Sequence, residues 1–187
     1  MSAAPRSRVK ICGITTPEDL ALVDAAGADY AGIVLVPGSK RFVSPAALAA
    51  LGRVPVRLKR VGVFVRAKPR AIAAAVRLGR LDVVQLYHCT FRRAGVEVWH
   101  ATPGPWRRAP IVLDAAPGMG RVGDWPKAAR IARRRRVILA GGLSPENVAE
   151  AIATVHPACV DTASGTECAP GRKDAQKVKD FIRKAKP

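Results

Sequence analysis

The chain has 187 residues, 49% of them hydrophobic, and its 32 Lys and Arg residues against 14 Asp and Glu residues give a formal net charge of +18. A chain of this length can bury a full core, so neither disorder nor a disulfide-stapled miniprotein is needed to account for the sequence. No apolar run reaches the roughly 18 residues of a membrane-spanning helix, and residues 1–8 lack the apolar stretch of a secretory signal. We therefore expect a cytoplasmic protein that folds as one domain over 1–187, with 1–7 as a flexible tail.

Short apolar runs alternate with amphipathic stretches along the whole chain. Strands are predicted at 9–12, 30–36, 60–65, 81–86, 96–101, 111–113, 137–140 and 159–163. Helices are predicted at 17–26, 44–51, 69–78, 124–134, 144–155 and 173–186. Three of them begin at a Ser or Thr followed by Pro, a pattern typical of a helix N-terminus. Eight strands alternating with helices indicate parallel βαβ units, and eight strands close a (β/α)₈ TIM barrel.

Two connections, 87–95 and 102–110, are short for this architecture. A crossover between parallel strands normally takes a dozen residues or more. Nine residues in an extended conformation are still long enough to return from the end of one strand to the start of the next. We therefore expect the fourth and fifth helices of the barrel to be trimmed to loops. The wall would then expose apolar side chains, with Val98, Trp99 and Trp106 as candidates, and we expect a homodimer through the 87–110 sector.

The positive charge is scattered along the chain. Its one dense run, 133–136, falls at a predicted helix end, where cations interact favourably with the helix dipole. Aromatic residues make up 5% of the chain, which leaves few side chains for stacking on bases. We therefore expect only nonspecific attraction of nucleic acid, and no membrane partner.

The four cysteines are widely spaced, without a CxxC pair or a Cys/His cluster. They stand at 12, 89, 159 and 168. A disulfide framework and a metal site are therefore not expected.

In such barrels the working residues follow the C-terminal ends of the strands. Gly141-Gly142 follows the seventh predicted strand and Ser164-Gly165 the eighth. Glycine lets backbone N–H groups approach an anion closely, and these two loops commonly bind phosphate in barrels. The pattern favours a small phosphorylated substrate, although a glycine pair after a strand is often only a tight turn.

Cys12 ends the first predicted strand and Asp114 the sixth, so a thiol and a carboxyl should face one cavity. Such a pair can serve as base and acid when the surroundings bring both pKa values towards neutrality. A buried apolar cysteine and a loop-capping aspartate explain the same residues equally well.

Nine segments run in the order seen in the phosphoribosylanthranilate isomerases. They are VKICGIT at 9–15, PGSKRFVSP at 37–45, VGVFV at 61–65, VVQL at 83–86, VLD at 112–114, GMGRVGDW at 118–125, LAGGLSPENV at 139–148, VDTASGTE at 160–167 and PGRKD at 170–174. The resemblance covers about residues 8–186. It implies a barrel enzyme of tryptophan biosynthesis, an aromatic amino acid pathway. Its reaction would be the Amadori rearrangement of N-(5-phosphoribosyl)anthranilate to 1-(2-carboxyphenylamino)-1-deoxyribulose 5-phosphate, with no cofactor and no metal.

The resemblance also implies a role for each matching residue. Asp114 would be the general acid that protonates the furanose oxygen as the ring opens. Cys12 would be the base that takes the proton from C2 of the resulting Schiff base. Arg41 would bind the anthranilate carboxylate through its fork of donors. The other substrate-binding positions would be Lys10, Gly118, Gly120, Gly141, Gly142, Asp161, Ser164 and Gly165.

One departure from the family stands beside the site. The family usually reads QLHG after the fourth strand, whereas this chain has Tyr87 at the histidine position and His88 one place later. Two alternatives stay open. One is a catalytically weak, trimmed barrel that binds RNA or another polyanion. The other is a related isomerase for a substrate with two phosphates, for which no second anion cradle is visible in the sequence.

Overall fold

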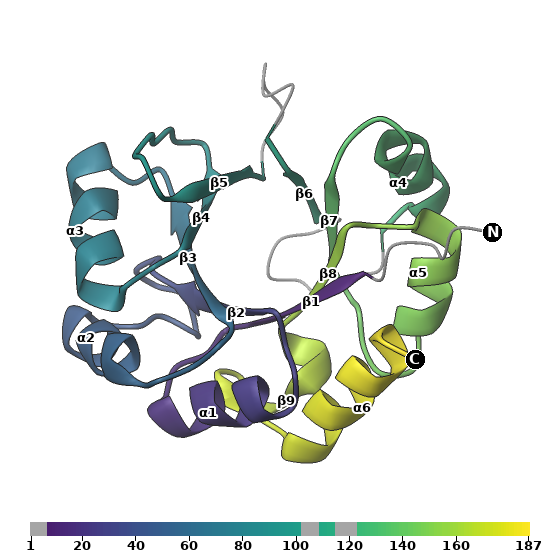
Figure 1. The fold of residues 1–187 in the computed structure, drawn as a ribbon, viewed down its shortest axis with the longest axis horizontal. Helices are drawn as coiled ribbons and strands as arrows, with labels where there is room; N and C mark the ends of the chain where they lie inside the picture. Colours follow the sequence, from purple (N-terminus) through teal and green to yellow (C-terminus); the bar gives the residue numbers. More distant parts are fainter. Residues whose placement is uncertain (1–6, 102–108, 115–122) are drawn as a thin grey trace.

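The computed structural model describes residues 7–101, 109–114 and 123–187, and these form a closed barrel of parallel strands (Figure 1). The strands are β1 (Arg8–Cys12), β2 (Tyr30–Val34), β3 (Lys59–Val65), β4 (Val83–Tyr87), β5 (Glu97–His100), β6 (Ile111–Asp114), β7 (Val137–Ala140) and β8 (Cys159–Thr162). Each strand pairs with the next along the chain, and β8 pairs back to β1. The TIM-barrel prediction is confirmed.

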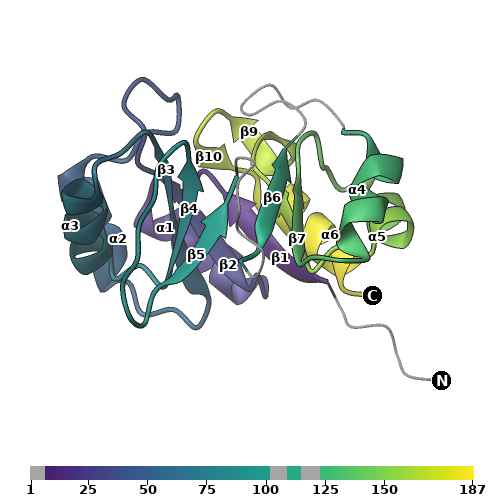
Figure 2. The ribbon, with the colours of Figure 1, turned by 90° about the horizontal axis from the view of Figure 1, so that it is seen from above.

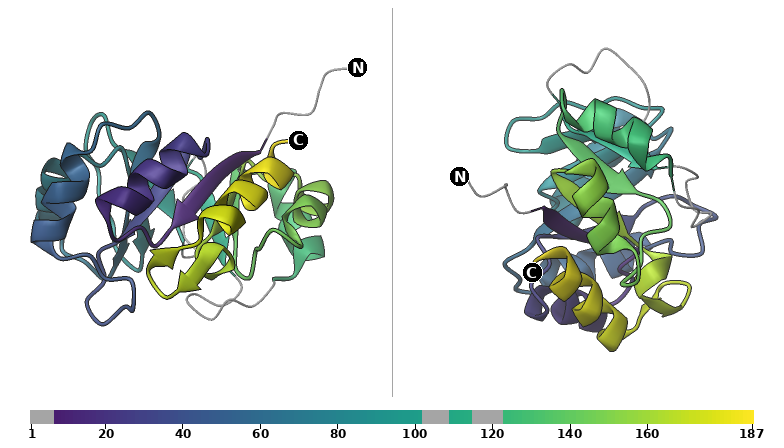
Figure 3. Two further views of the ribbon diagram at one scale, coloured as in Figure 1. Left: turned by 90° about the horizontal axis from the view of Figure 1, so that it is seen from below. Right: turned by 90° about the vertical axis from the view of Figure 1, so that its right-hand side faces the viewer.

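Helices surround the strands on most of the ring. They are α1 (Pro17–Ala25), α2 (Pro45–Arg53), α3 (Pro69–Gly79), α4 (Trp125–Ala132), α5 (Val148–Val155) and α6 (Ala175–Ala185). Helix α5 lies between α4 and α6 (Figure 3). The predicted caps form at Thr16, which accepts from the backbone N–H of Asp19 at 3.1 Å, and at Ser44. None of the helices that the structure describes has the length and apolarity needed to cross a lipid bilayer.

Helix α5 begins later than the predicted start at Ser144. The reason is Asn147, whose Oδ1 accepts from the Ser144 N–H and whose Nδ2 donates to the Gly142 carbonyl, both at 2.9 Å. These bonds hold residues 144–147 in a turn, so that Asn147 becomes the N-cap.

A small hairpin between β8 and α6 was not predicted. It consists of a 3₁₀ turn, η1 (Ser164–Thr166), followed by the antiparallel strands β9 (Glu167–Ala169) and β10 (Arg172–Lys173). The hairpin lies at the end of the barrel opposite the C-terminus (Figure 2). The last helix therefore starts at Ala175, with Asp174 as its N-cap, rather than at the predicted Lys173.

The connection from β4 to β5 contains no helix, as predicted. Its Phe91 is 8% exposed and belongs to the hydrophobic core that packs outside the ring. Most of the other short connection lies outside the described residues. Across it, β5 and β6 share a single register pair among the described residues, His100 with Ile111.

The expectation that Trp99 belongs to an exposed patch is wrong. Its side chain is 1% exposed and points into the barrel, where it meets the Tyr30 ring edge-on at 4.9 Å and donates from Nε1 to Glu97. Side chains alternate along a strand, so the neighbouring Val98 faces outwards and is partly buried. Trp106 lies outside the described residues.

Ser7, expected in the flexible tail, is instead buried, and its Oγ donates to the Pro157 carbonyl at 2.7 Å. Residues 1–6, the rest of the expected tail, lie outside the described residues.

Replacing Trp99 with alanine should cost about 3–5 kcal/mol of unfolding free energy, because the truncation opens a cavity inside the barrel. Urea denaturation followed by circular dichroism measures this cost. Val98→Ala, the adjacent outward-facing change, should cost much less. Equal small losses for the two variants would contradict the interior placement of Trp99.

Candidate active site

A cavity of about 270 Å³ opens at the C-terminal ends of the barrel strands. Cys12 ends β1 and Asp114 ends β6, and both line this cavity, as the strand pattern predicts. The other predicted site residues in its wall are Arg41, Gly141, Gly142, Asp161 and Ser164. Lys10 and Gly165 are not in the wall, and Gly118 and Gly120 lie outside the described residues.

The Cys12 side chain fits because its neighbour on β2 is a glycine. Cys12 and Gly32 are register partners, and a Cβ on Gly32 would lie 2.5 Å from the Cys12 sulfur. Burial raises the pKa of the Cys12 thiol, while the nearby Lys10 ammonium opposes this increase. The thiol form therefore predominates at neutral pH in the ligand-free protein.

Lys10 and Asp161 form an ion pair inside the barrel. Lys10 has no exposed surface, and its Nζ lies 2.6 Å from Asp161 Oδ2. Burial favours the neutral amine, but the charge and hydrogen bond of Asp161 outweigh it and raise the pKa of Lys10. The other carboxylate oxygen of Asp161, Oδ1, is buried without a hydrogen bond to any described residue. Because Asp161 lines the cavity, Lys10 fixes the position of a carboxylate in the cavity wall.

The loops after β7 and β8 meet beside the cavity. Gly141 and Gly142 adopt φ values of +93° and +63°, a conformation that favours glycine. A Cβ on Gly165 would collide with the Leu143 carbonyl oxygen, to which Thr162 Oγ1 donates at 2.6 Å. Gly165 therefore serves the contact between the two loops, while Gly142 and Ser164 face the cavity from either side.

Tyr87 takes the position at which the family usually has histidine. It lines the cavity, and its hydroxyl accepts a hydrogen bond from Gln85 Nε2 at 3.0 Å. Burial and the charge of Asp114 raise the pKa of Tyr87, so its phenol stays neutral. The following His88 is exposed and is absent from the cavity wall, so the site presents a phenol here rather than an imidazole.

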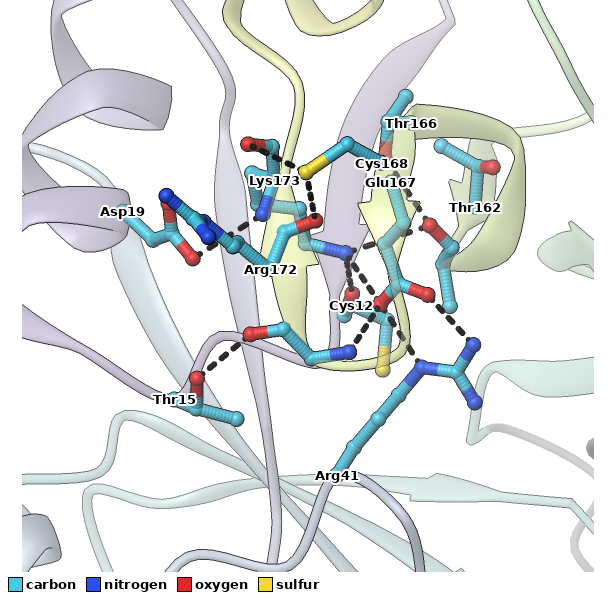
Figure 4. Close-up of polar contacts among 12 residues, drawn as sticks. Cys12, Thr15, Asp19, Arg41, Thr162, Thr166, Glu167, Cys168, Arg172 and Lys173 are labelled. Atoms are coloured by element: carbon cyan, nitrogen blue, oxygen red, sulfur yellow. Dashed lines mark hydrogen bonds and ion pairs between the residues drawn. The ribbon is translucent and has the colours of Figure 1, made fainter.

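Glu167 and Lys173, on the unpredicted hairpin, form a charged cluster with Arg41 beside the cavity (Figure 4). Glu167 accepts two hydrogen bonds from Arg41, from Nε at 2.8 Å and from Nη2 at 2.6 Å, and its Oε1 lies 3.0 Å from Lys173 Nζ. Both residues belong to the segments VDTASGTE and PGRKD that carry the resemblance. A single charge in a loop shows no periodicity, so no pattern assigned them a role.

No cluster of three or more His, Cys, Asp or Glu side chains suited to a metal ion occurs among the residues that the structure describes.

The raised pKa of Cys12 predicts slow alkylation. At pH 7, iodoacetamide should modify Cys12 at least tenfold more slowly than the exposed Cys168, and the Cys12 rate should still climb above pH 8.5, about the usual thiol pKa. Peptide mass spectrometry at a series of pH values measures both rates in one sample. A Cys12 rate that has already levelled off at pH 7 would contradict this.

The family model of N-(5′-phosphoribosyl)anthranilate (PRA) isomerase matches residues 9–100 and 106–184. Curated N-(5′-phosphoribosyl)anthranilate isomerases from Geobacter sp. (strain M21) and Trichlorobacter lovleyi are 39% and 40% identical to this chain. Each match covers 96% of this chain and 98% of the relative.

Solved structures agree with this match. The phosphoribosyl anthranilate isomerase of Thermotoga maritima superimposes with a TM-score of 0.86 at 36% identity, over 96% of this chain and 98% of that one. Another such isomerase, in complex with reduced 1-(o-carboxyphenylamino)-1-deoxyribulose 5-phosphate, gives 0.83 at 35% identity with the same coverage. The comparisons do not support the alternative of a polyanion-binding barrel. The chain therefore belongs to the N-(5′-phosphoribosyl)anthranilate isomerase family and is an isomerase of tryptophan biosynthesis.

Proposed function

We propose that Asp114 and Cys12 carry out the isomerisation of phosphoribosylanthranilate as general acid and general base. The observation that carries this proposal is the shared cavity. The two residues come from strands β1 and β6, far apart around the ring, and both face the same 270 Å³ space beside the glycine loops. A sugar bound there can be reached from two sides.

The first step opens the furanose ring. The amine lone pair forms the C1=N bond as the bond between C1 and the ring oxygen breaks, and Asp114 gives its proton to that oxygen. This leaves an open-chain Schiff base with a positive charge near the cavity wall. A positive charge lowers the pKa of a nearby thiol, so the bound intermediate favours the thiolate of Cys12.

The second step moves the proton from C2. The Cys12 thiolate takes it, and the electrons of the C2–H bond form a C1=C2 double bond while the C=N pair returns to nitrogen. The resulting enolamine tautomerises to the ketose amine. On becoming a thiolate Cys12 loses its own proton to solvent, and it ends the step with the proton from C2. Asp114 regains a proton from solvent, so atoms and charge balance and the net change is an isomerisation.

Three groups would hold the substrate during these steps. The loops with Gly142 and Ser164 would accept the phosphate, Arg41 would bind the anthranilate carboxylate, and the Asp161 carboxylate would accept a hydrogen bond from a sugar hydroxyl. The ligand named for the solved relative carries a phosphate and a carboxyphenyl group, which supports two separate anion sites.

Cys12→Ala and Asp114→Asn should each lower kcat by about 100-fold or more, the usual contribution of a positioned proton-transfer group. Both variants should still bind the reduced product analogue, because neither change removes an anion site. Stopped-flow fluorescence and calorimetry measure the two quantities, with Cys168→Ala as the control for an exposed thiol. Full activity of Asp114→Asn would overturn the assignment.

We also propose a cytoplasmic location. All four cysteines are free thiols, which fits a reducing compartment.

The 87–110 sector is our proposed surface for self-association. Support comes from the helix-free β4–β5 connection, from the outward-facing Val98, and from a dimeric isomerase of Thermotoga maritima among the solved relatives. Light scattering at high micromolar concentration should give twice the mass of one chain. Val98→Glu should give monomers, whereas Leu78→Glu, on the exposed side of α3, should not. A monomeric parent protein would overturn this proposal.

A further inference from the structure

We propose that Glu167 is a positioning residue for Arg41, and that Lys173 supplies the charge which lets this paired arginine still bind a carboxylate. The inference rests on the proposed role of Arg41 as the site for the anthranilate carboxylate, and it deepens that role. Neither Glu167 nor Lys173 would touch the substrate.

The first step in the argument is the two-point contact between Arg41 and Glu167. With Nε and Nη2 both donating to the carboxylate, the plane of the guanidinium is fixed. Its remaining nitrogen, Nη1, makes no hydrogen bond to another residue that the structure describes, and Arg41 lines the cavity. Glu167 therefore decides which edge of the arginine a ligand meets.

The second step is packing behind the arginine. Gly13 follows Cys12 directly with φ at +80°, and a Cβ there would lie 2.6 Å from Arg41 Cδ and 3.2 Å from Glu167 Oε1. The arginine thus rests against the backbone beside the proposed base. Its orientation relative to Cys12 depends on a close approach that only glycine permits.

The third step concerns charge. An arginine neutralised by a glutamate has little net attraction for a second carboxylate. Lys173 changes this balance, because its ammonium lies 3.0 Å from the same glutamate. Two positive charges and one negative charge leave the cluster at +1, which suits one carboxylate.

Lys173 must be protonated for this balance to hold, and its contacts require it. Its Nζ donates to Glu167 and to the carbonyls of Cys12 at 2.6 Å and Ala163 at 3.2 Å. Three acceptors need three N–H bonds, which only the ammonium form has. Burial lowers the pKa of Lys173, and the charge of Glu167 opposes this.

Lys173 cannot serve as the ligand contact itself. Its side chain has no exposed surface, whereas that of Arg41 is 17% exposed. Of these three residues only Arg41 lines the cavity, so the positive charge of the cluster faces a ligand through the arginine, whose contacts with Glu167 are drawn in Figure 4.

The test compares two substrates, phosphoribosylanthranilate and its analogue made from aniline, which lacks the carboxylate. Glu167→Gln raises the charge of the cluster from +1 to +2 but removes the two-point contact that fixes the guanidinium plane. We expect the lost orientation to outweigh the added charge, so that kcat/KM falls about tenfold or more on the first substrate, the size expected for a lost charge-assisted contact. On the second substrate kcat/KM should change less than twofold. Arg41→Ala should show the same selectivity. The double variant should be no worse than Arg41→Ala, because the two residues act as one unit.

Asp19→Asn is the matched structural control. Asp19 accepts from the backbone N–H of Lys173 and so anchors the hairpin, but it does not contact Arg41. Its replacement should affect both substrates equally. Glu167→Gln losses that are equal on both substrates, or absent on both, would overturn the positioning role. If Arg41→Ala affects both substrates equally, the proposed role of Arg41 as the carboxylate site is overturned too. If Arg41→Ala is selective and Glu167→Gln is not, only the positioning role of Glu167 is overturned.

The charge is tested by Lys173→Met, with thermal melting to confirm folding. It should raise KM about tenfold for the carboxylate-bearing substrate only, while any change in kcat, caused by the lost support of the Cys12 thiolate, should be equal on both substrates. Lys177→Met removes the same charge from a neighbour that contacts the backbone carbonyl of Glu167 rather than its carboxylate, and it should leave KM within twofold. Equal effects of the two lysine changes would overturn the role of Lys173.

Discussion

The closure of the ring between β1 and β8 is the constraint on which the site depends. Lys10 on β1 and Asp161 on β8 are register partners, and their side chains form an ion pair. The Lys10 side chain has no solvent-exposed surface. Such a pair adds little stability over apolar packing, but losing one partner costs about 3–5 kcal/mol, because a charge is left buried alone. A one-residue slip would turn Lys10 to the outer face. The pair therefore selects the register that brings Cys12 and the β8 loop to one cavity.

Charged groups around Cys12 lie in two tiers. Lys10 and Asp161 belong to the barrel interior, whereas Lys173 and Glu167 belong to the hairpin at its mouth. Both lysines favour the thiolate, and burial opposes them more strongly, so the free thiol stays protonated. If Cys12 is the base, this arrangement would keep it protonated until a cationic intermediate forms beside it. Catalytic power here would come from charges that the fold places permanently, a form of electrostatic preorganisation.

The C-terminal ends of the strands could be predicted from the sequence, because most of the strands are short apolar runs followed by a Gly or an ionisable residue. That rule alone placed Cys12, Asp114 and Gly142 correctly in one wall. The inward direction of Trp99 was missed, since the weak pattern of its strand does not show which face is buried. The hairpin was missed because two very short strands have no detectable alternation. Glu167 and Lys173 acquire their roles only when residues far apart in the chain meet, and a single sequence does not contain that information.

The number of backbone pairs between neighbouring strands differs around the barrel. The strand that carries the proposed base pairs with a neighbour on each edge, while β5 and β6 share a single register pair among the described residues. The preceding β4–β5 connection contains no helix. Local opening of a protein starts where backbone pairing and apolar contacts are fewest. Asp114 stands on β6, at that seam. Local opening of the barrel would thus move the proposed acid while the proposed base stays in place, so the distance between these two residues depends on the part of the wall with the fewest contacts.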